Sequence, residues 1–240
     1  VLDTHLGLTL EALEETGQAD NTLVIFTSEQ GSQFPGNKWT NWNTGVHTGF
    51  VARWPGRVEA GRRTGALIQY SDVLPTLIEA AQGKPKGGDF DGTSFLSVLL
   101  GRADRHRKYA YFMHNNIPEG PPYPIRAVTD GTYHYIRNLA PENLYIEKHL
   151  MGEMQWHAYW PTWLAQTGPR KGQGYDREAV RLITRYMRRP AEELYRVDLD
   201  PFEMNNLMEE PEHSDAKSRL SGESDSRSQE AITHVANSSD

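Results

Sequence analysis

Hydrophobic residues at helical spacing are the first pattern in the chain. Leu2, Leu6, Leu10 and Leu13 recur at intervals of three or four residues, and Gly17 lies where a helix C-cap is expected. This spacing predicts an amphipathic helix that ends just before Gly17. Residue 1 already lies inside the pattern, with neither an N-cap nor a start methionine, so we expect the sequence to be a portion of a longer chain.

The next segments alternate between apolar runs and polar loops. Residues 22–27 are apolar and β-branched without alternation, which predicts a strand buried on both faces. Residues 50–54 predict a second strand, and residues 67–70 are candidates for a third. A helix is expected from residue 71 or 72, with Leu74, Leu77, Ile78 and Ala81 on one face. Helix, strand, loop, strand and helix are the order typical of a layered α/β domain.

The pattern changes from about residue 87. Residues 109–113, 125–128, 133–139 and 193–198 predict strands, and a hairpin is expected across Asp130-Gly131. Residues 176–187 predict a helix. We therefore expect an α/β domain over residues 1–86 and a small antiparallel sheet with one packed helix over residues 87–208. Residues 209–240 are rich in Ser, Glu and Asp, which predicts a disordered tail.

Composition excludes several classes of protein. The 240 residues include 25 Lys and Arg and 32 Asp and Glu. The resulting net charge of −7 argues against general nucleic-acid binding. No apolar run approaches the roughly 20 residues that a membrane-spanning helix needs. Cysteine is absent, which excludes disulfides and thiolate chemistry within this sequence. The sequence leaves both a monomer and a homo-oligomer open.

The loop after the first predicted strand carries the candidate chemistry. Glu29 and Gln30 place a carboxylate beside an amide oxygen, and hard cations such as Ca²⁺ bind such oxygens. The pair is too small for a whole site, because Ca²⁺ takes about 6–8 ligands, and an ordinary solvated loop would also fit. Lys38 is either a surface lysine or a point charge for an oxyanion.

Longer motifs decide between these alternatives. Residues 20–31 read DNTLVIFTSEQG, which resembles the sulfatase pattern D-N-T-L-V/I-V/I-F/Y-T-S-D-N/H-G. The sulfatase pattern K-x-x-x-Y/L-E-G-G follows, and here Lys38, Trp42 and Gly45 match it. Residues 53–56 (RWPG), 70–77, 91–96 and 193–207 match further sulfatase motifs, so the resemblance covers residues 1–208.

The resemblance implies an alkaline-phosphatase-like sulfatase sandwich, of which this sequence would be the C-terminal part. It implies one Ca²⁺ ion held in part by Glu29 and Gln30, and a sulfate group contacted by Lys38 as a catalytic and substrate-binding residue. It also implies a sulfated sugar substrate of glycosaminoglycan type and an exported or lysosomal enzyme. Segments at residues 34–35, 123–128 and 160–163 are most similar to heparan N-sulfatases.

The same resemblance names further candidates for the sugar pocket. His114 and Arg126 lie in the segment that would border it, although each could equally be structural. His47 takes the place of a sulfatase arginine and would hold the loop only when protonated. Trp156, Trp160 and Trp163 could stack on a sugar ring or belong to the core.

Some sulfatase features are missing from the sequence. Sulfatases use a formylglycine made from the Cys or Ser of a C/S-x-P-x-R motif, which does not occur in these 240 residues. We expect that motif in an N-terminal part, and we expect the chain by itself to be inactive. Two alternatives stay open: a phosphonate or phosphate monoester hydrolase of the same superfamily, and a non-catalytic, glycan-binding remnant.

Overall fold

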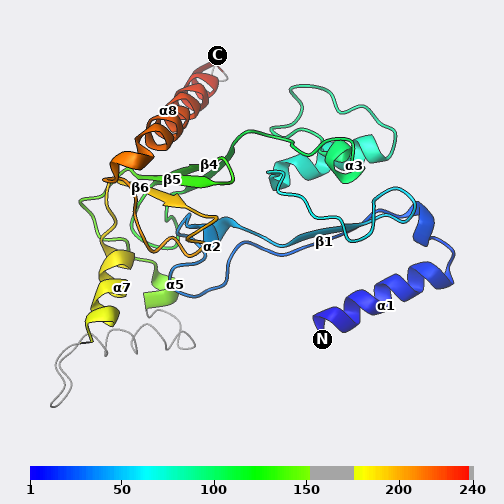
Figure 1. The fold of residues 1–240 in the computed structure, drawn as a ribbon, viewed down its shortest axis with the longest axis horizontal. Coiled ribbons are helices and arrows are strands. Elements are labelled where there is room, and N and C mark those ends of the chain that lie inside the picture. Colours follow the sequence, from blue (N-terminus) through cyan, green and yellow to red (C-terminus); the bar gives the residue numbers. More distant parts are fainter. Residues whose placement is uncertain (152–175, 238–240) are drawn as a thin grey trace. The chain divides into compact units, whose positions relative to one another are not determined.

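The structure is a computed structural model that describes residues 1–151 and 176–237 (Figure 1). The chain forms two compact units. The first comprises Val1–Glu29 and Thr48–Ala110, and the second comprises Gln30–His47 and Tyr111–Asp240. These units are groups of contacts, so they do not test the expected division of the chain at residues 86 and 208, which stays a prediction.

The first unit begins with the predicted helix, α1 (Leu2–Glu15), followed by a 3₁₀ turn, η1 (Ala19–Asn21). Strands β1 (Val24–Thr27) and β2 (Phe50–Arg53) pair antiparallel, with Val24 opposite Arg53. The expected burial of the first strand on both faces is wrong for this structure. Val24, Ile25 and Phe26 are only half-buried, because within the described residues β1 pairs with β2 alone.

The third strand, predicted over residues 67–70, is present only as a single bridge. Leu67 makes a single antiparallel bridge with Arg107, and Tyr70–Asp72 form the 3₁₀ turn η2 instead. The buried carboxylate of Asp72 directs this part of the chain: it accepts hydrogen bonds from the backbone N–H of Gln69 at 2.8 Å and of Thr93 at 2.9 Å. A capping interaction with Asp72 at its centre therefore replaces strand pairing here.

Two helices complete the first unit, α3 (Val73–Ala80) and the single turn α4 (Leu96–Leu99). The helix predicted at α3 is confirmed, but its apolar face is not the buried one: Leu74 and Leu77 are exposed. The buried side carries Thr76, whose hydroxyl accepts from the Phe95 N–H at 2.9 Å. Hydrogen bonding to the following loop, rather than the leucine stripe, sets the orientation of α3.

The second unit is built on a four-stranded antiparallel sheet. Its strands, in spatial order, are β3 (Ala110–His114), β4 (Ile125–Thr129), β5 (Tyr133–Asn138) and β6 (Glu192–Arg196). The predicted hairpin is confirmed, with Thr129 opposite His134 and Gly131 at a φ of 90°. Asp130 closes the turn by accepting the N–H groups of Thr132 and Tyr133 at 2.9 and 2.7 Å.

Helices lie on both faces of this sheet (Figure 1). On one side are α2 (Asn43–Val46), α5 (Lys148–Met151) and the predicted helix α7 (Arg177–Met187), which Asp176 caps through the Ala179 N–H at 3.0 Å. The core on this side consists of aromatic and aliphatic residues: Trp42, Tyr123, Ile125, Ala127, Ile136, Tyr145, Leu150, Ile183, Tyr186 and Tyr195.

The other face is covered by α8 (Ser214–Asn237), which follows the turn η3 (Pro211–His213). This helix differs from the disordered tail expected of its composition. Ala216, Leu220 and Ser224 are buried at intervals of four residues, and α8 contacts β4 and β5. A narrow apolar strip on one helix face suffices for packing even where the mean composition is strongly polar.

Candidate functional site

The candidate chemistry lies on the loop that connects β1 to β2. Ser28 and Gly49 close its base: the Ser28 N–H donates to the Gly49 carbonyl at 3.1 Å, and the Gly49 N–H donates to the Ser28 hydroxyl at 3.0 Å. Gln30–His47, which we call the Lys38 loop, belongs to the second unit, whereas Glu29 is the last residue of the first. The chain thus passes from one unit to the other between the two candidate calcium ligands.

Glu29 and Gln30 are both exposed at the end of β1. Their donor set fits a hard cation in kind, since a carboxylate and an amide each offer oxygen. It does not fit in number: a search of the described residues finds no group of three or more His, Cys, Asp or Glu side chains that could hold a metal ion. These two residues can supply only part of a calcium site.

The Lys38 loop is folded tightly on itself. A Cβ built on Gly31 would lie 2.9 Å from the backbone nitrogen of Lys38, and one built on Gly45 would lie 2.3 Å from the carbonyl oxygen of Asn37. Contacts this close exclude any side chain at the two positions. The loop is further closed by the Thr44 hydroxyl, which donates to the Gly36 carbonyl at 2.6 Å.

Lys38 lies in the middle of this loop and is half-buried. Its Nζ is 5.8 Å from the centroid of the Trp39 ring, and Trp39 in turn stacks on His149 of α5 with centroids 5.6 Å apart. A half-buried lysine beside an aromatic ring has part of its side chain held away from water, which suits it to bind an anionic group.

His47 does not hold the loop in this structure. It is exposed at the end of α2, and its backbone N–H donates to the Asn43 carbonyl at 2.8 Å. Within the described part of the chain its imidazole makes no ion pair. The expectation that His47 substitutes for a loop-holding arginine is therefore not supported by its position, while a substrate contact stays a prediction.

His114 and Arg126 lie on the adjacent strands β3 and β4. Arg126 donates to the Asn115 side chain at 2.9 Å and to the Ile125 carbonyl at 2.8 Å. Burial lowers the pKa of His114, and the neighbouring Glu119 carboxylate opposes this only in part. A neutral histidine and a tethered arginine can offer hydrogen bonds to a sugar, and this role stays a prediction.

The residues that hold the Lys38 loop were not among the candidates from the sequence. The indole N–H of Trp42 donates to Glu193 of β6 at 2.8 Å, and the Arg189 guanidinium donates to the same carboxylate at 2.9 Å. Glu193 falls inside the sulfatase-like motif at residues 193–207, which is the signal that could have identified it.

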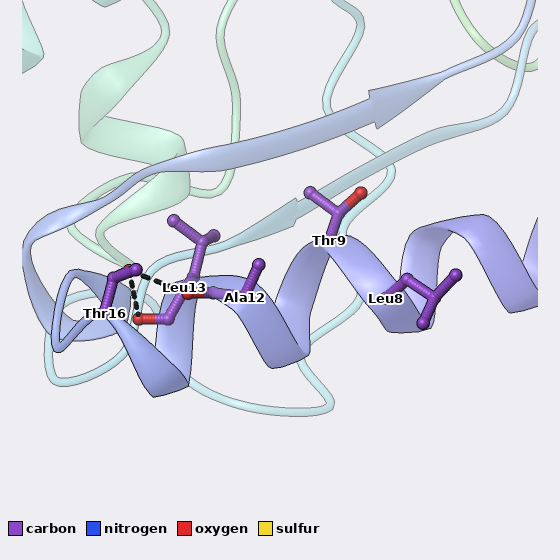
Figure 2. A pocket seen from close by; sticks show the side chains of 5 residues that line it. All are labelled: Leu8, Thr9, Ala12, Leu13 and Thr16. Carbon is purple, nitrogen blue, oxygen red and sulfur yellow. Dashed lines mark hydrogen bonds between the residues drawn. The ribbon is translucent and has the colours of Figure 1, made fainter.

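A separate hollow of about 480 Å³ lies against α1 in the first unit (Figure 2). Figure 2 shows the residues that line it: Leu8, Thr9, Ala12, Leu13 and Thr16. The Thr16 hydroxyl is used locally, donating to the Ala12 carbonyl at 2.7 Å. None of these lining residues is ionisable, so this hollow is not the expected site.

The three tryptophans considered for stacking on a sugar ring, Trp156, Trp160 and Trp163, lie outside the described residues.

Comparisons with known proteins agree with the sulfatase-like motifs. The family model described as Sulfatase matches residues 2–83. An ulvan-active sulfatase of Formosa agariphila is 34% identical over 211 residues, which cover 87% of this chain and 37% of that protein. The mouse (Mus musculus) steryl-sulfatase is 32% identical over 134 residues, which cover 48% of this chain and 21% of the relative. The match thus spans little more than a third of the length of the ulvan-active sulfatase and about a fifth of that of the steryl-sulfatase.

Solved structures show the same fold. One, a protein in complex with its substrate D-glucosamine-2-N,6-O-disulfate, superposes with a TM-score of 0.65 at 19% identity, over 95% of this chain and 38% of that one. A phosphonate monoester hydrolase from Silicibacter pomeroyi superposes with a TM-score of 0.57 at 18% identity, over 98% of this chain and 38% of that one. The heparan N-sulfatase branch is not established by these matches and stays a prediction.

The mixed α/β fold with antiparallel sheets, the Lys38 loop and these similarities lead to one identification: this chain belongs to the sulfatase family, within the alkaline-phosphatase-like superfamily.

Proposed function

We propose that the protein hydrolyses a sulfate ester or sulfamate of a sulfated sugar and that Lys38 binds the sulfate group. The observation that carries this proposal is the position of Lys38, half-buried in a tightly closed loop whose flanking residues match the sulfatase pattern. The similarity to an ulvan-active sulfatase over 87% of the chain supports the reaction class.

Lys38 acts by electrostatic stabilisation. Sulfate hydrolysis places additional negative charge on the leaving oxygen and redistributes charge over the sulfate oxygens, and a fixed ammonium next to them lowers the barrier. Such a group is effective when it is already in place before the reaction, since no reorganisation is then needed. The close packing of Gly31 and Gly45 against the backbone of Lys38 and Asn37 within the loop supports this fixed placement.

Glu29 and Gln30 would supply two of the oxygens around a Ca²⁺ ion. When bound, that ion provides Lewis-acid stabilisation of the sulfate oxygens. Because Glu29 carries the only formal charge of the pair, it contributes more of the attraction to the cation than Gln30 does. The nucleophile that the family implies, a formylglycine, has no source motif in this sequence, so the residues described here bind and orient the substrate.

The substrate class is a sulfated sugar of glycosaminoglycan type, recognised in part by His114 and Arg126. A sulfated glucosamine bound to a structural neighbour supports this class. The first unit carries the calcium carboxylate, and the second carries Lys38, His114 and Arg126. Substrate binding would therefore depend mainly on residues of the second unit.

The test compares substrates with the full-length protein, which includes the expected N-terminal part. Nitrophenyl sulfate should be hydrolysed well and nitrophenyl phenylphosphonate at least about a hundredfold more slowly; the reverse preference would identify a phosphonate monoester hydrolase. Glucosamine 6-O-sulfate and glucosamine N-sulfate then separate an ester hydrolase from an N-sulfohydrolase. A protein that turns over none of these but binds heparin fragments, with or without Ca²⁺, would be a glycan-binding remnant.

A further inference from the structure

Residues immediately after Lys38 are fastened to the core of the second unit at four points. Every partner comes from a distant part of the sequence. The Tyr145 hydroxyl donates to the Trp39 carbonyl at 3.1 Å, and Arg189 donates to the Thr40 carbonyl at 2.6 Å. The remaining two anchors are the Trp42 indole to Glu193 at 2.8 Å and the Asn43 N–H to Glu203 at 2.7 Å.

Trp42 is the centre of this set. Two guanidinium groups contact its ring, Arg185 at 3.8 Å and Arg189 at 4.4 Å from the ring centroid, and its side chain is almost completely buried. Cation–π contacts are strongest when both partners are desolvated. The indole N–H then has a single charged acceptor, Glu193, which is itself buried.

Glu193 is fully committed to this network. Besides Trp42 and Arg189, it accepts hydrogen bonds from the Tyr195 hydroxyl at 2.6 Å and from the Asn138 side chain at 2.7 Å. Arg189 and the other donors hold the pKa of Glu193 below its usual range against the opposing effect of burial. A buried carboxylate with all of its partners in place has one favoured position, and it transmits that position to Trp42.

The anchors hold the backbone in a conformation that it would not adopt alone. Trp39 and Asn41 have φ values of 74° and 57°, in the left-handed region that non-glycine residues rarely occupy. Such conformations persist where the surroundings over-determine them. Lys38 directly precedes this stretch, so any relaxation at residues 39–42 would move its side chain.

We propose that Trp42 is a positioning residue for Lys38, and that the buried Arg189–Glu193 pair is the support through which β6 and the segment between α7 and β6 fix the Lys38 loop. This inference rests on the proposed role of Lys38 in binding sulfate. The competing explanation is that Trp42 contributes packing alone, with no effect on how Lys38 is held.

The test uses Trp42→Phe in the intact protein. This change keeps an aromatic ring beside the two arginines and removes the donor to Glu193. The matched control is Trp54→Phe in the first unit: Trp54 is also buried with an arginine over its ring, Arg57 at 4.7 Å, but its indole N–H has no hydrogen-bond partner among the described residues.

The first readout is hydrogen–deuterium exchange of the loop amides that are bonded inside the loop, those of Lys38, Thr40 and Gly45. Trp42→Phe should speed their exchange about tenfold, the effect of losing one buried hydrogen bond, and Trp54→Phe should leave it unchanged. Unchanged exchange in Trp42→Phe would overturn the proposal. If this variant fails to fold, Tyr145→Phe tests the anchoring of the loop, because it keeps the ring and removes the donor to the Trp39 carbonyl, together with a hydroxyl contact to Tyr186 outside the loop.

The second readout separates positioning from packing. Trp42→Phe should lower kcat for nitrophenyl sulfate about tenfold with little change in KM. In a Lys38→Ala background, Trp42→Phe should lower kcat by less than about twofold, because the ammonium that Trp42 positions is then absent. Equal losses in both backgrounds would mean packing alone. If Lys38→Ala has wild-type activity, the proposed function of Lys38 fails, while the exchange measurement still decides whether Trp42 fixes the loop.

Discussion

The indole of Trp42 and the carboxylate of Glu193 form a buried hydrogen bond of 2.8 Å between residues 151 positions apart in the sequence. Glu193 lies on β6, an edge strand of the second unit's sheet, where it is paired with Ile136 of β5. Trp42 lies at the start of α2 in the Lys38 loop. The bond thus ties the loop with the candidate chemistry to the most regular element of the unit.

Removing the charge of Glu193 should destabilise the second unit strongly. Glu193→Gln leaves the Arg189 guanidinium buried without its counter-ion, and breaking such a pair costs about 3–5 kcal/mol of the free energy of unfolding. Urea unfolding followed by circular dichroism measures this loss. Asp198→Asn is the control, since its ion pair with Arg196 is largely exposed and worth at most about 1 kcal/mol. Similar losses in the two variants would contradict the importance of the buried pair.

Removing the Lys38 ammonium should abolish most turnover and leave the fold intact. In the full-length enzyme, Lys38→Ala is expected to lower kcat for nitrophenyl sulfate by about 10²–10³, as for the loss of one fixed charge-stabilising group. Circular dichroism and the urea midpoint should stay as in the wild type. Lys84→Ala, at an exposed lysine of the first unit, serves as the control and should have wild-type activity. Full activity in Lys38→Ala would remove Lys38 from the mechanism.

Local signals predicted the elements that depend on near neighbours in the sequence. Asp130-Gly131 and Asp176 act through hydrogen bonds that reach two or three residues along the chain, and the hairpin and the helix they predict are present. The support of the Lys38 loop could not be predicted in this way. Each of its four anchors joins residues more than 100 positions apart, and no local pattern records such a pairing.

The predicted tail shows the limit of mean composition. From residue 209 the low apolar content favours disorder, yet Ala216, Leu220 and Ser224 recur every fourth residue on one face of α8. Packing of that strip against β4 and β5 offsets the entropy lost on folding. The four-residue spacing of these positions was the available signal for a helix, and the mean composition of residues 209–240 obscured it.

Leu220 should account for much of the attachment of α8. Its side chain is completely buried, so Leu220→Ala is expected to lower the free energy of unfolding by about 2–5 kcal/mol and to reduce the helical signal in circular dichroism. Ser218→Ala, exposed on the same helix, should change stability by less than about 0.5 kcal/mol. A Leu220→Ala protein with wild-type helicity and stability would show that α8 does not pack on the sheet in solution.

Neutralising Glu29 should weaken calcium binding. Glu29→Gln keeps an oxygen at the same reach and removes the negative charge, so we expect the dissociation constant for Ca²⁺ to rise at least about tenfold. Isothermal titration calorimetry of the metal-free protein measures binding without reference to activity. Glu59→Gln, an exposed carboxylate of the same unit, should leave the constant unchanged. Equal affinities for wild type and Glu29→Gln would exclude Glu29 as a ligand.

The stability of the second unit should decrease on the acid side of neutrality because of His114. Burial lowers the pKa of this imidazole below 6.5; Arg189 acts in the same direction, while the Glu119 carboxylate and a side-chain hydrogen bond with Asn116 oppose it. The folded state therefore favours neutral His114, and the unfolded chain binds the proton more readily. This contribution to stability is complete above about pH 6.5 and is lost as the pH falls below that value.

His114→Gln removes the titrating group at similar size. The variant should show a smaller decrease in urea midpoint between about pH 7.5 and pH 5.5 than the wild type does. His5→Gln, exposed on α1, should retain the full wild-type decrease. If His114→Gln keeps that full decrease as well, the imidazole ionises equally easily in the folded and unfolded states. The proposed binding of a sugar by a neutral His114 would then be rejected.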